Sequence, residues 1–185
     1  MTEPVPLLAI LERNYFQLFE LPEQFPLDQS VLNDKYLHLQ KVAHPDRYAT
    51  ALARERVMAG QLAAYANEAY HVLKGDLSRA QYLLQLTEGA SAQQGTSVTE
   101  PAILMEQMEL REQLEGISQS QNPLLAIDQF ANDITVKTQK LKQEFGESFS
   151  RKAFEHAKRI VNQWQFFDRL KQEVDDLAAE LEEGN

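Results

Sequence analysis

The sequence predicts an all-α protein built from two helical units. Apolar residues recur at helical spacing through most of the 185 residues, and no run of residues alternates as a strand would. Only 7 glycines and 7 prolines are present, and the clearest polar, small-residue interruption lies at residues 88–98. We therefore expect an N-terminal extension at residues 1–13, a first unit at 14–87, a linker at 88–98 and a second unit at 99–183.

The first unit is expected to begin with a short helix that Asn14 caps. After a loop marked by two prolines, Asp28 is expected to cap a helix that continues to about Ala43. Its apolar residues follow one another at intervals of four, three and four, which predicts a buried stripe of Leu32, Tyr36, Leu39 and Ala43. The remaining helices of this unit are expected from Thr50 to about Leu73 and around residues 79–86.

The second unit is expected to hold three helices. The first starts at Thr99, with a proline in its first turn, and continues to about Ile117. The second follows the Asn122-Pro123 break and continues to about Phe145, and the third spans roughly residues 148–182. Three helices with short connections predict a small antiparallel bundle.

Composition excludes several classes of function. Hydrophobic residues make up 43% and charged residues 25%, as in folded globular proteins. The absence of cysteine excludes disulfides, thiolate-ligated zinc or iron–sulfur clusters and a cysteine nucleophile, so we expect no resident metal or cofactor. No apolar run is long enough to cross a membrane, and residues 1–13 lack the features of a signal peptide. We expect a cytoplasmic protein that does not bind membranes.

Charge argues against nucleic-acid binding. The net charge is −10, and residues 98–185 carry ten basic and seventeen acidic residues, a net −7. A surface with this excess of carboxylates does not suit the neutralisation of phosphates on which nucleic-acid affinity depends.

The tripeptide His44-Pro45-Asp46 separates the second and third helices of the first unit. Proline lacks a backbone N–H and disfavours helical geometry at the residue before it, so the helix should end before His44. An imidazole and a carboxylate are then displayed on an exposed turn. An enzyme could use them as an acid–base pair, but neither a nucleophile nor a third orienting group accompanies them. Docking to another protein is the favoured interpretation.

The helix before this turn carries an aligned basic face. Lys35, His38 and Lys41 recur every three residues, and Arg47 follows just after the turn. The alternative for the two lysines is that they only keep the exposed helix surface soluble. For a lone surface histidine such as His38 or His71, we favour the interpretation that it has no specific role.

Residues 14–86 resemble a J domain, the module that docks onto DnaK-class chaperones and stimulates their ATP hydrolysis. The residues that carry the resemblance are Tyr15-Phe16, Lys35-Tyr36, the tripeptide and the Asn67-Glu68-Ala69-Tyr70 segment, in the order and spacing of that family. The resemblance implies that Asp46 accepts a charge-assisted hydrogen bond from a chaperone arginine, with His44 beside it and Pro45 fixing the turn. It also implies that Lys35, His38, Lys41 and Arg47 meet acidic chaperone surface.

A second apolar face is predicted on the first helix of the second unit. On a helical projection of residues 101–117, five residues form the core stripe: Ile103, Gln107, Leu110, Leu114 and Ile117. Leu104, Met105 and Met108 project to the opposite side with two glutamates. These apolar groups are either buried by neighbouring helices of the bundle or left exposed for a partner, a role that suits methionine.

Three further segments resemble the HscB-type J-proteins of bacterial iron–sulfur cluster assembly: residues 104–112, 79–84 and 166–170. In that family the C-terminal bundle binds an IscU-type scaffold and delivers it to an HscA chaperone. The positions implied for scaffold contact are Leu104, Met105, Met108, Glu109, Glu112 and Phe166. Gly116 departs from the family, which has an acidic contact residue there, so that contact is absent here or shifted to Glu115.

The sequence thus predicts an adaptor with two ends, one for an HscA/DnaK-class chaperone and one for an IscU-type scaffold. The protein would stimulate the ATPase of its partner and have no catalysis of its own. One alternative is a J-domain co-chaperone that recruits a different client. Another is a purely structural helical protein, which would leave the exposure of the tripeptide unexplained.

Overall fold

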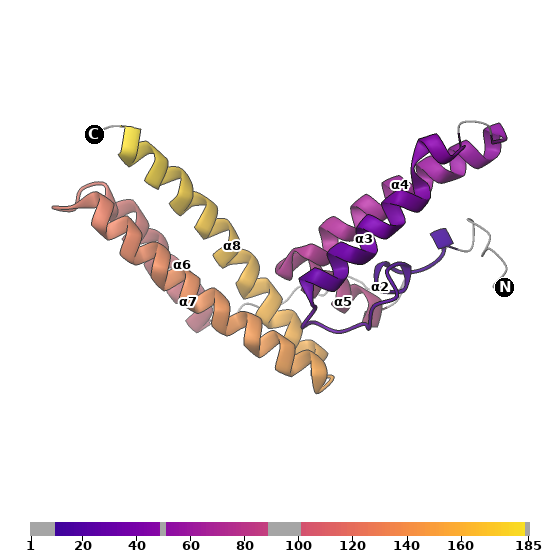
Figure 1. Ribbon diagram of the computed structural model, residues 1–185. Helices are drawn as coiled ribbons and strands as arrows, with labels where there is room; N and C mark the ends of the chain where they lie inside the picture. The colour runs from indigo at the N-terminus through magenta and orange to yellow at the C-terminus, as the bar shows by residue number, and fades with distance from the viewer. Residues whose placement is uncertain (1–9, 49–50, 89–100, 184–185) are drawn as a thin grey trace. The chain divides into compact units, whose positions relative to one another are not determined.

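The computed structural model describes residues 10–48, 51–88 and 101–183, and the regular structure in these ranges is entirely helical (Figure 1). The all-α prediction is confirmed. The chain divides into two compact units, Met1–Leu83 and Leu84–Asn185, which we describe separately. The caps predicted at Thr50 and Thr99 and nearly all of the predicted linker lie outside the described residues. Within these ranges, no helix has the length and apolar character needed to cross a membrane.

The first unit is organised around an antiparallel pair of helices. These are α3 (Gln29–Ala43) and α4 (Ala53–Lys74), joined through the 3-10 turn η1 (Pro45–Tyr48), and they lie side by side in Figure 1. The short α2 (Tyr15–Leu18) packs against α4, and α5 (Asp76–Glu88) crosses the division between the units.

Two of the three N-caps predicted in the first unit, Asn14 and Asp28, are confirmed, whereas α4 begins after Leu52 and not at Thr50. The Asn14 side chain accepts a hydrogen bond from the Gln17 backbone N–H at 2.9 Å, and the Gln17 side chain accepts from the Asn14 N–H at 3.3 Å. The Asp28 carboxylate accepts from the N–H groups of Ser30 and Val31 at 2.9 and 3.3 Å. Polar side chains at these positions satisfy backbone donors that have no partner within the helix.

The Asn67-Glu68-Ala69-Tyr70 segment ties the helices of the first unit together. The Tyr70 ring stacks on Tyr36 of α3 with centroids 4.0 Å apart, and the Tyr36 hydroxyl donates to Asn67 Oδ1 at 2.9 Å. Glu68 accepts a hydrogen bond from the Tyr15 hydroxyl at 2.9 Å, and Ala69 is fully buried. Each residue of the segment therefore helps to fix the hairpin that carries the turn.

Among the residues that the structure describes, Arg79 is the largest fully buried side chain, only 2% exposed. Its Nε donates to the Phe25 carbonyl at 2.9 Å and its Nη1 to the Leu73 carbonyl at 2.6 Å, and Nη2 pairs with Asp76. The guanidinium also lies over the Phe25 ring, 5.0 Å from its centroid. A buried guanidinium is tolerated because its donors are matched in this way.

We expect Arg79→Met to lower the free energy of unfolding of the first unit by about 2 kcal/mol, because two buried carbonyls would lose their donor. All six tyrosines lie in this unit and the single tryptophan in the other, so tyrosine circular dichroism during urea unfolding isolates it. Arg54→Met, at an exposed position on α4, is the control and should change stability by less than about 0.5 kcal/mol. Equal midpoints of urea unfolding for Arg79→Met and Arg54→Met would contradict the prediction.

Alkaline pH is expected to destabilise the first unit through Tyr15, Tyr65 and Tyr82. Burial raises the pKa of all three phenols, and the hydrogen bond to Glu68 raises that of Tyr15 further. Unfolded phenols titrate near pH 10, so this stabilisation is complete below about pH 10 and is lost as pH rises through the higher folded pKa values. Urea midpoints from about pH 8 to about pH 11 should therefore fall, and less steeply in Tyr15→Phe. A decline of the same slope in Tyr15→Phe would contradict this.

The second unit consists of α6 (Pro101–Ile117), α7 (Pro123–Ser150) and α8 (Phe154–Glu183). Helices α7 and α8 pair along their length, and α6 packs against both (Figure 1). The core is formed by aliphatic and aromatic residues that recur at helical spacing; the largest are Ile127, Phe130, Ile134, Phe145, Trp164, Phe166 and Phe167. The three-helix prediction is confirmed, and so is the cap at Asn122, whose side chain accepts from the Leu125 N–H at 3.3 Å.

One helix boundary in this unit was predicted wrongly. Helix α7 continues through Gly146 to Ser150, and α8 begins at Phe154 instead of near residue 148. Lys152 adopts a positive φ of 59°. Its N–H donates to the Phe149 carbonyl at 3.0 Å, and the Ala153 N–H donates to the Ser148 carbonyl at 2.9 Å. These paired bonds form a Schellman cap, which ends α7 at a lysine although glycine is the usual residue there.

Candidate functional site

The His44-Pro45-Asp46 turn begins where α3 ends. As predicted from the proline, the last helical residue is Ala43 and His44 is extended, with φ −61° and ψ 132°. The chain then closes a 3-10 turn in which the Arg47 N–H donates to the His44 carbonyl at 3.1 Å. The two titratable side chains are thereby displayed on a short, hydrogen-bonded connection between two packed helices.

Asp46 is an almost completely solvated carboxylate, because its side chain is 92% exposed. His44 is 59% exposed, and its Nδ1 accepts the Asp46 backbone N–H at 3.3 Å. The same Nδ1 lies 3.6 Å from Asp46 Oδ2, but an ion pair there would require a proton on the nitrogen that is already accepting. In the neutral ring the proton is therefore on Nε2, which leaves one N–H donor and one carboxylate acceptor for a partner.

In the part of the chain that the structure describes, the His44 and Asp46 side chains form hydrogen bonds or ion pairs only within the turn itself. Nor do any three histidine, aspartate or glutamate side chains in the described ranges come together as metal ligands.

The basic face of α3 is divided by one intramolecular ion pair. Lys35 Nζ lies 2.7 Å from Glu20 Oε2, while His38, Lys41 and Arg47 are exposed. The hydrogen bond from Lys35, together with its charge, lowers the pKa of the Glu20 carboxyl. Glu20 follows α2 with a positive φ of 51°, in a cap closed by a 2.8 Å bond from the Leu21 N–H to the Phe16 carbonyl. Lys35 is thus already paired, so Lys41 and Arg47 are the freer cations of the face, with the His38 ring exposed between Lys35 and Lys41.

The second candidate surface is the outer side of α6. Leu104, Met105 and Met108 are 51%, 61% and 64% exposed, whereas Leu110, Leu114 and Ile117 of the same helix are buried. Burial of these apolar groups within the bundle, the alternative considered above, is therefore wrong. Glu109, Glu112 and Glu115 are exposed around them. Three large exposed apolar side chains with carboxylates on the following turns of the helix form a surface of the kind that binds other proteins. We call these three residues and the glutamates beside them the α6 face.

Phe166 differs from the other residues implied for scaffold contact, because it is only 5% exposed. The Arg111 guanidinium lies over its ring, 6.0 Å from the centroid, and Arg111 is itself 3.9 Å from a carboxylate oxygen of Glu173. A partner could contact the Phe166 ring directly only if Arg111 moved. In this conformation the Phe166 ring is buried beneath Arg111 of α6. No feature of the sequence pattern distinguishes Phe166 from its buried neighbour Phe167.

Gly116, where the resemblance implies an acidic residue, lies on the surface of α6. This glycine is exposed, and a Cβ added there would meet no atom within 4 Å. A longer side chain would therefore fit at this position.

Comparison with known proteins relates both units of the chain to one family. Residues 99–175 match the model of the HscB C-terminal oligomerisation domain. The co-chaperone protein HscB homologue of Aliivibrio fischeri is 38% identical over 168 residues, which cover 91% of this chain and 98% of that protein. The chaperone HscB from Vibrio cholerae, also 38% identical, superimposes with a TM-score of 0.82 over 91% of this chain and 99% of its own.

Human co-chaperone protein HscB shares the fold at 24% identity, with a TM-score of 0.79 over 95% of this chain and 84% of its own. The bacterial matches extend over both compact units and include the turn as well as the α6 face. On this identity and coverage, the chain belongs to the HscB family of co-chaperones.

Proposed function

We propose that this protein is an adaptor of iron–sulfur protein maturation. Its first unit docks onto an HscA/DnaK-class chaperone through the His44-Pro45-Asp46 turn and stimulates ATP hydrolysis by that chaperone. Its second unit binds an IscU-type scaffold through the α6 face and delivers it to the chaperone. We place this activity in the cytoplasm, and we assign the protein no catalytic step of its own.

The observation that supports this proposal most is the exposure of Leu104, Met105 and Met108 on a helix that buries three other apolar residues in the bundle. Leaving three large apolar side chains in water is unfavourable unless a partner covers them. Methionine side chains adapt to an irregular partner surface, and the surrounding glutamates can orient it. At the other end, a solvated Asp46 carboxylate suits a charge-assisted bond to a guanidinium, which is strongest once water is excluded by docking.

The test is steady-state ATP hydrolysis by an HscA-type chaperone with this protein, with the scaffold, or with both. The proposal predicts that the two together stimulate more than the sum of their separate effects. Stimulation by this protein that the scaffold does not increase would instead favour a different client. ATP hydrolysis by this protein alone would contradict the adaptor role.

A further inference from the structure

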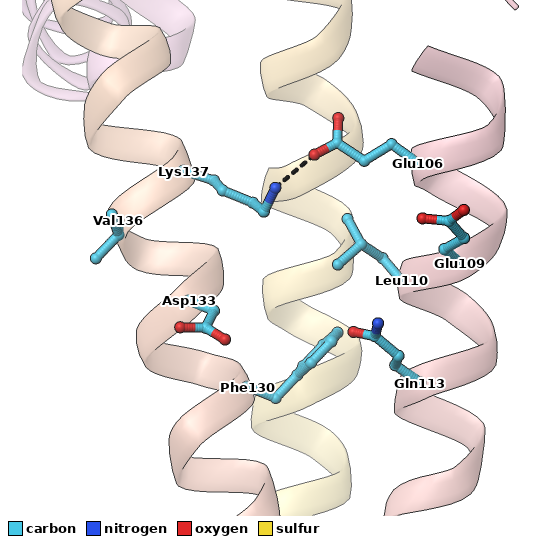
Figure 2. Close-up of a pocket in the computed structure, with 8 residues that line it drawn as sticks. All are labelled: Glu106, Glu109, Leu110, Gln113, Phe130, Asp133, Val136 and Lys137. Carbon is cyan, nitrogen blue, oxygen red and sulfur yellow. Dashed lines mark hydrogen bonds and ion pairs between the residues drawn. The ribbon is translucent and has the colours of Figure 1, made fainter. Parts of the chain in front are cut away.

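A groove of about 340 Å³ lies between α6 and α7 in the second unit, on the side of α6 next to the α6 face. Figure 2 shows the residues that line it, which come from both helices: Glu106, Glu109, Leu110, Gln113, Phe130, Asp133, Val136 and Lys137. Its apolar floor is formed by Leu110 and Phe130, each 7% exposed. Val136 stands at its edge and is 62% exposed, an unusual position for a β-branched apolar residue on a helix.

The charges along the groove are unevenly neutralised. Both carboxylate oxygens of Glu106 have partners. One pairs with Lys137 of α7 (Figure 2), and the other accepts a hydrogen bond from Gln163 of α8 at 3.2 Å. This pairing also neutralises Lys137. Glu109 and Asp133 form no ion pair or hydrogen bond with any other described side chain. The groove therefore presents two unneutralised carboxylates, one from each helix, above an apolar floor.

This combination matches the side chain of lysine or arginine. Such a side chain can lay its aliphatic stem along the apolar lining of the groove while its cationic head meets one of these carboxylates, Glu109 or Asp133. A second copy of this chain is a poor occupant, because residues 98–185 carry a net charge of −7 and would repel one another.

The groove is continuous with the α6 face. Glu109 lines the groove, follows Met108 directly in the sequence and is one helical turn from Met105. We propose that the groove receives a lysine or arginine of the same client that covers Leu104, Met105 and Met108, so that Asp133 and Val136 of α7 extend the client-binding surface onto a second helix. This inference rests on the proposed function.

The experiment measures the affinity of an IscU-type scaffold for the full-length protein by titration calorimetry at low and high salt. Asp133→Asn should weaken binding about fivefold at low salt, the upper range for one exposed ion pair, and less at high salt. The matched control is Asp128→Asn, which removes the same charge from an exposed position on the opposite side of α7 and should leave affinity unchanged. Stimulation of the chaperone by the first unit should be unaffected by both.

Two results would overturn the inference. Equal losses for Asp133→Asn and Asp128→Asn would mean that only overall charge matters, and no loss for Asp133→Asn would leave the groove empty in the complex. In either case a loss of scaffold binding in Met105→Ala/Met108→Ala would leave the proposed function intact. A second copy of this chain is the other possible occupant of the groove, and sedimentation analysis tests for it. If the protein forms a dimer that Asp133→Asn dissociates, the groove binds a second copy, and the inference is overturned as well.

Discussion

Asp46→Asn is expected to reduce stimulation of the chaperone ATPase to near the basal rate. The substitution keeps the shape of the side chain but removes its charge and replaces one acceptor oxygen with an NH2 donor, so the charge-assisted hydrogen bond to a chaperone arginine is lost. Loss of such a bond costs about 2 kcal/mol, which is roughly a 30-fold loss of affinity for the chaperone. The measurement is ATPase stimulation as a function of the concentration of this protein, with saturating scaffold.

Asp46→Asn should change chaperone docking without changing the stability of the protein or its affinity for the scaffold. Asp46 is 92% exposed, and its side chain approaches only His44, so the variant should unfold at the same urea concentration as the unmodified protein. Scaffold affinity should also be unchanged, because the turn and the α6 face belong to different compact units.

His44→Gln tests the same turn with a matched control. It replaces the ring whose Nδ1 accepts the Asp46 N–H, and we expect it to abolish the synergy between this protein and the scaffold. His71→Gln makes the same chemical change at another exposed histidine of the first unit, one for which we assign no role, and should leave the synergy intact. If His44→Gln and His71→Gln behave alike, the assignment of the turn to chaperone docking is wrong.

Helix starts that a polar side chain caps were predicted correctly from the sequence, whereas the start of α8 was not. Asn14, Asp28 and Asn122 each cap a helix through a side-chain oxygen, a signal that a sequence states directly. The ends after α2 and α7 are Schellman caps with Glu20 and Lys152 at positive φ. Glycine is the usual signal for such a cap, so neither end is marked in the sequence.

Some features of the two candidate surfaces could likewise be predicted from the sequence, and others could not. The exposed turn followed from the steric rule for the residue before proline, and the structure bears it out. Exposure of Met105 and Met108 could not be decided by periodicity, because a face opposite the core stripe can equally pack against another helix. The Lys35–Glu20 pair and the cover of Arg111 over Phe166 depend on side chains from separate helices or loops, which no local pattern encodes.

Met105→Ala combined with Met108→Ala is expected to cause the largest loss of scaffold affinity. The two side chains are 61% and 64% exposed in this protein, so they are available to be buried by a partner. Truncation of a well-packed interface anchor typically costs 1 kcal/mol or more, and about 1.5 kcal/mol for each methionine gives roughly a 100-fold weaker complex. Titration calorimetry with the scaffold measures the loss, while stimulation of the chaperone by this protein alone should persist.

Leu125→Ala is the matched control for this loss. Leu125 is a large apolar residue with 53% of its surface exposed, and it lies on α7 outside both the α6 face and the groove. Its backbone N–H, which bonds Asn122, is retained in alanine, so the cap of α7 should persist. If apolar exposure alone drove binding, Leu125→Ala would weaken the complex as much as either methionine variant does. A loss confined to Met105 and Met108 requires a partner shaped to the α6 face, whereas equal losses would remove the basis for assigning that face to the scaffold.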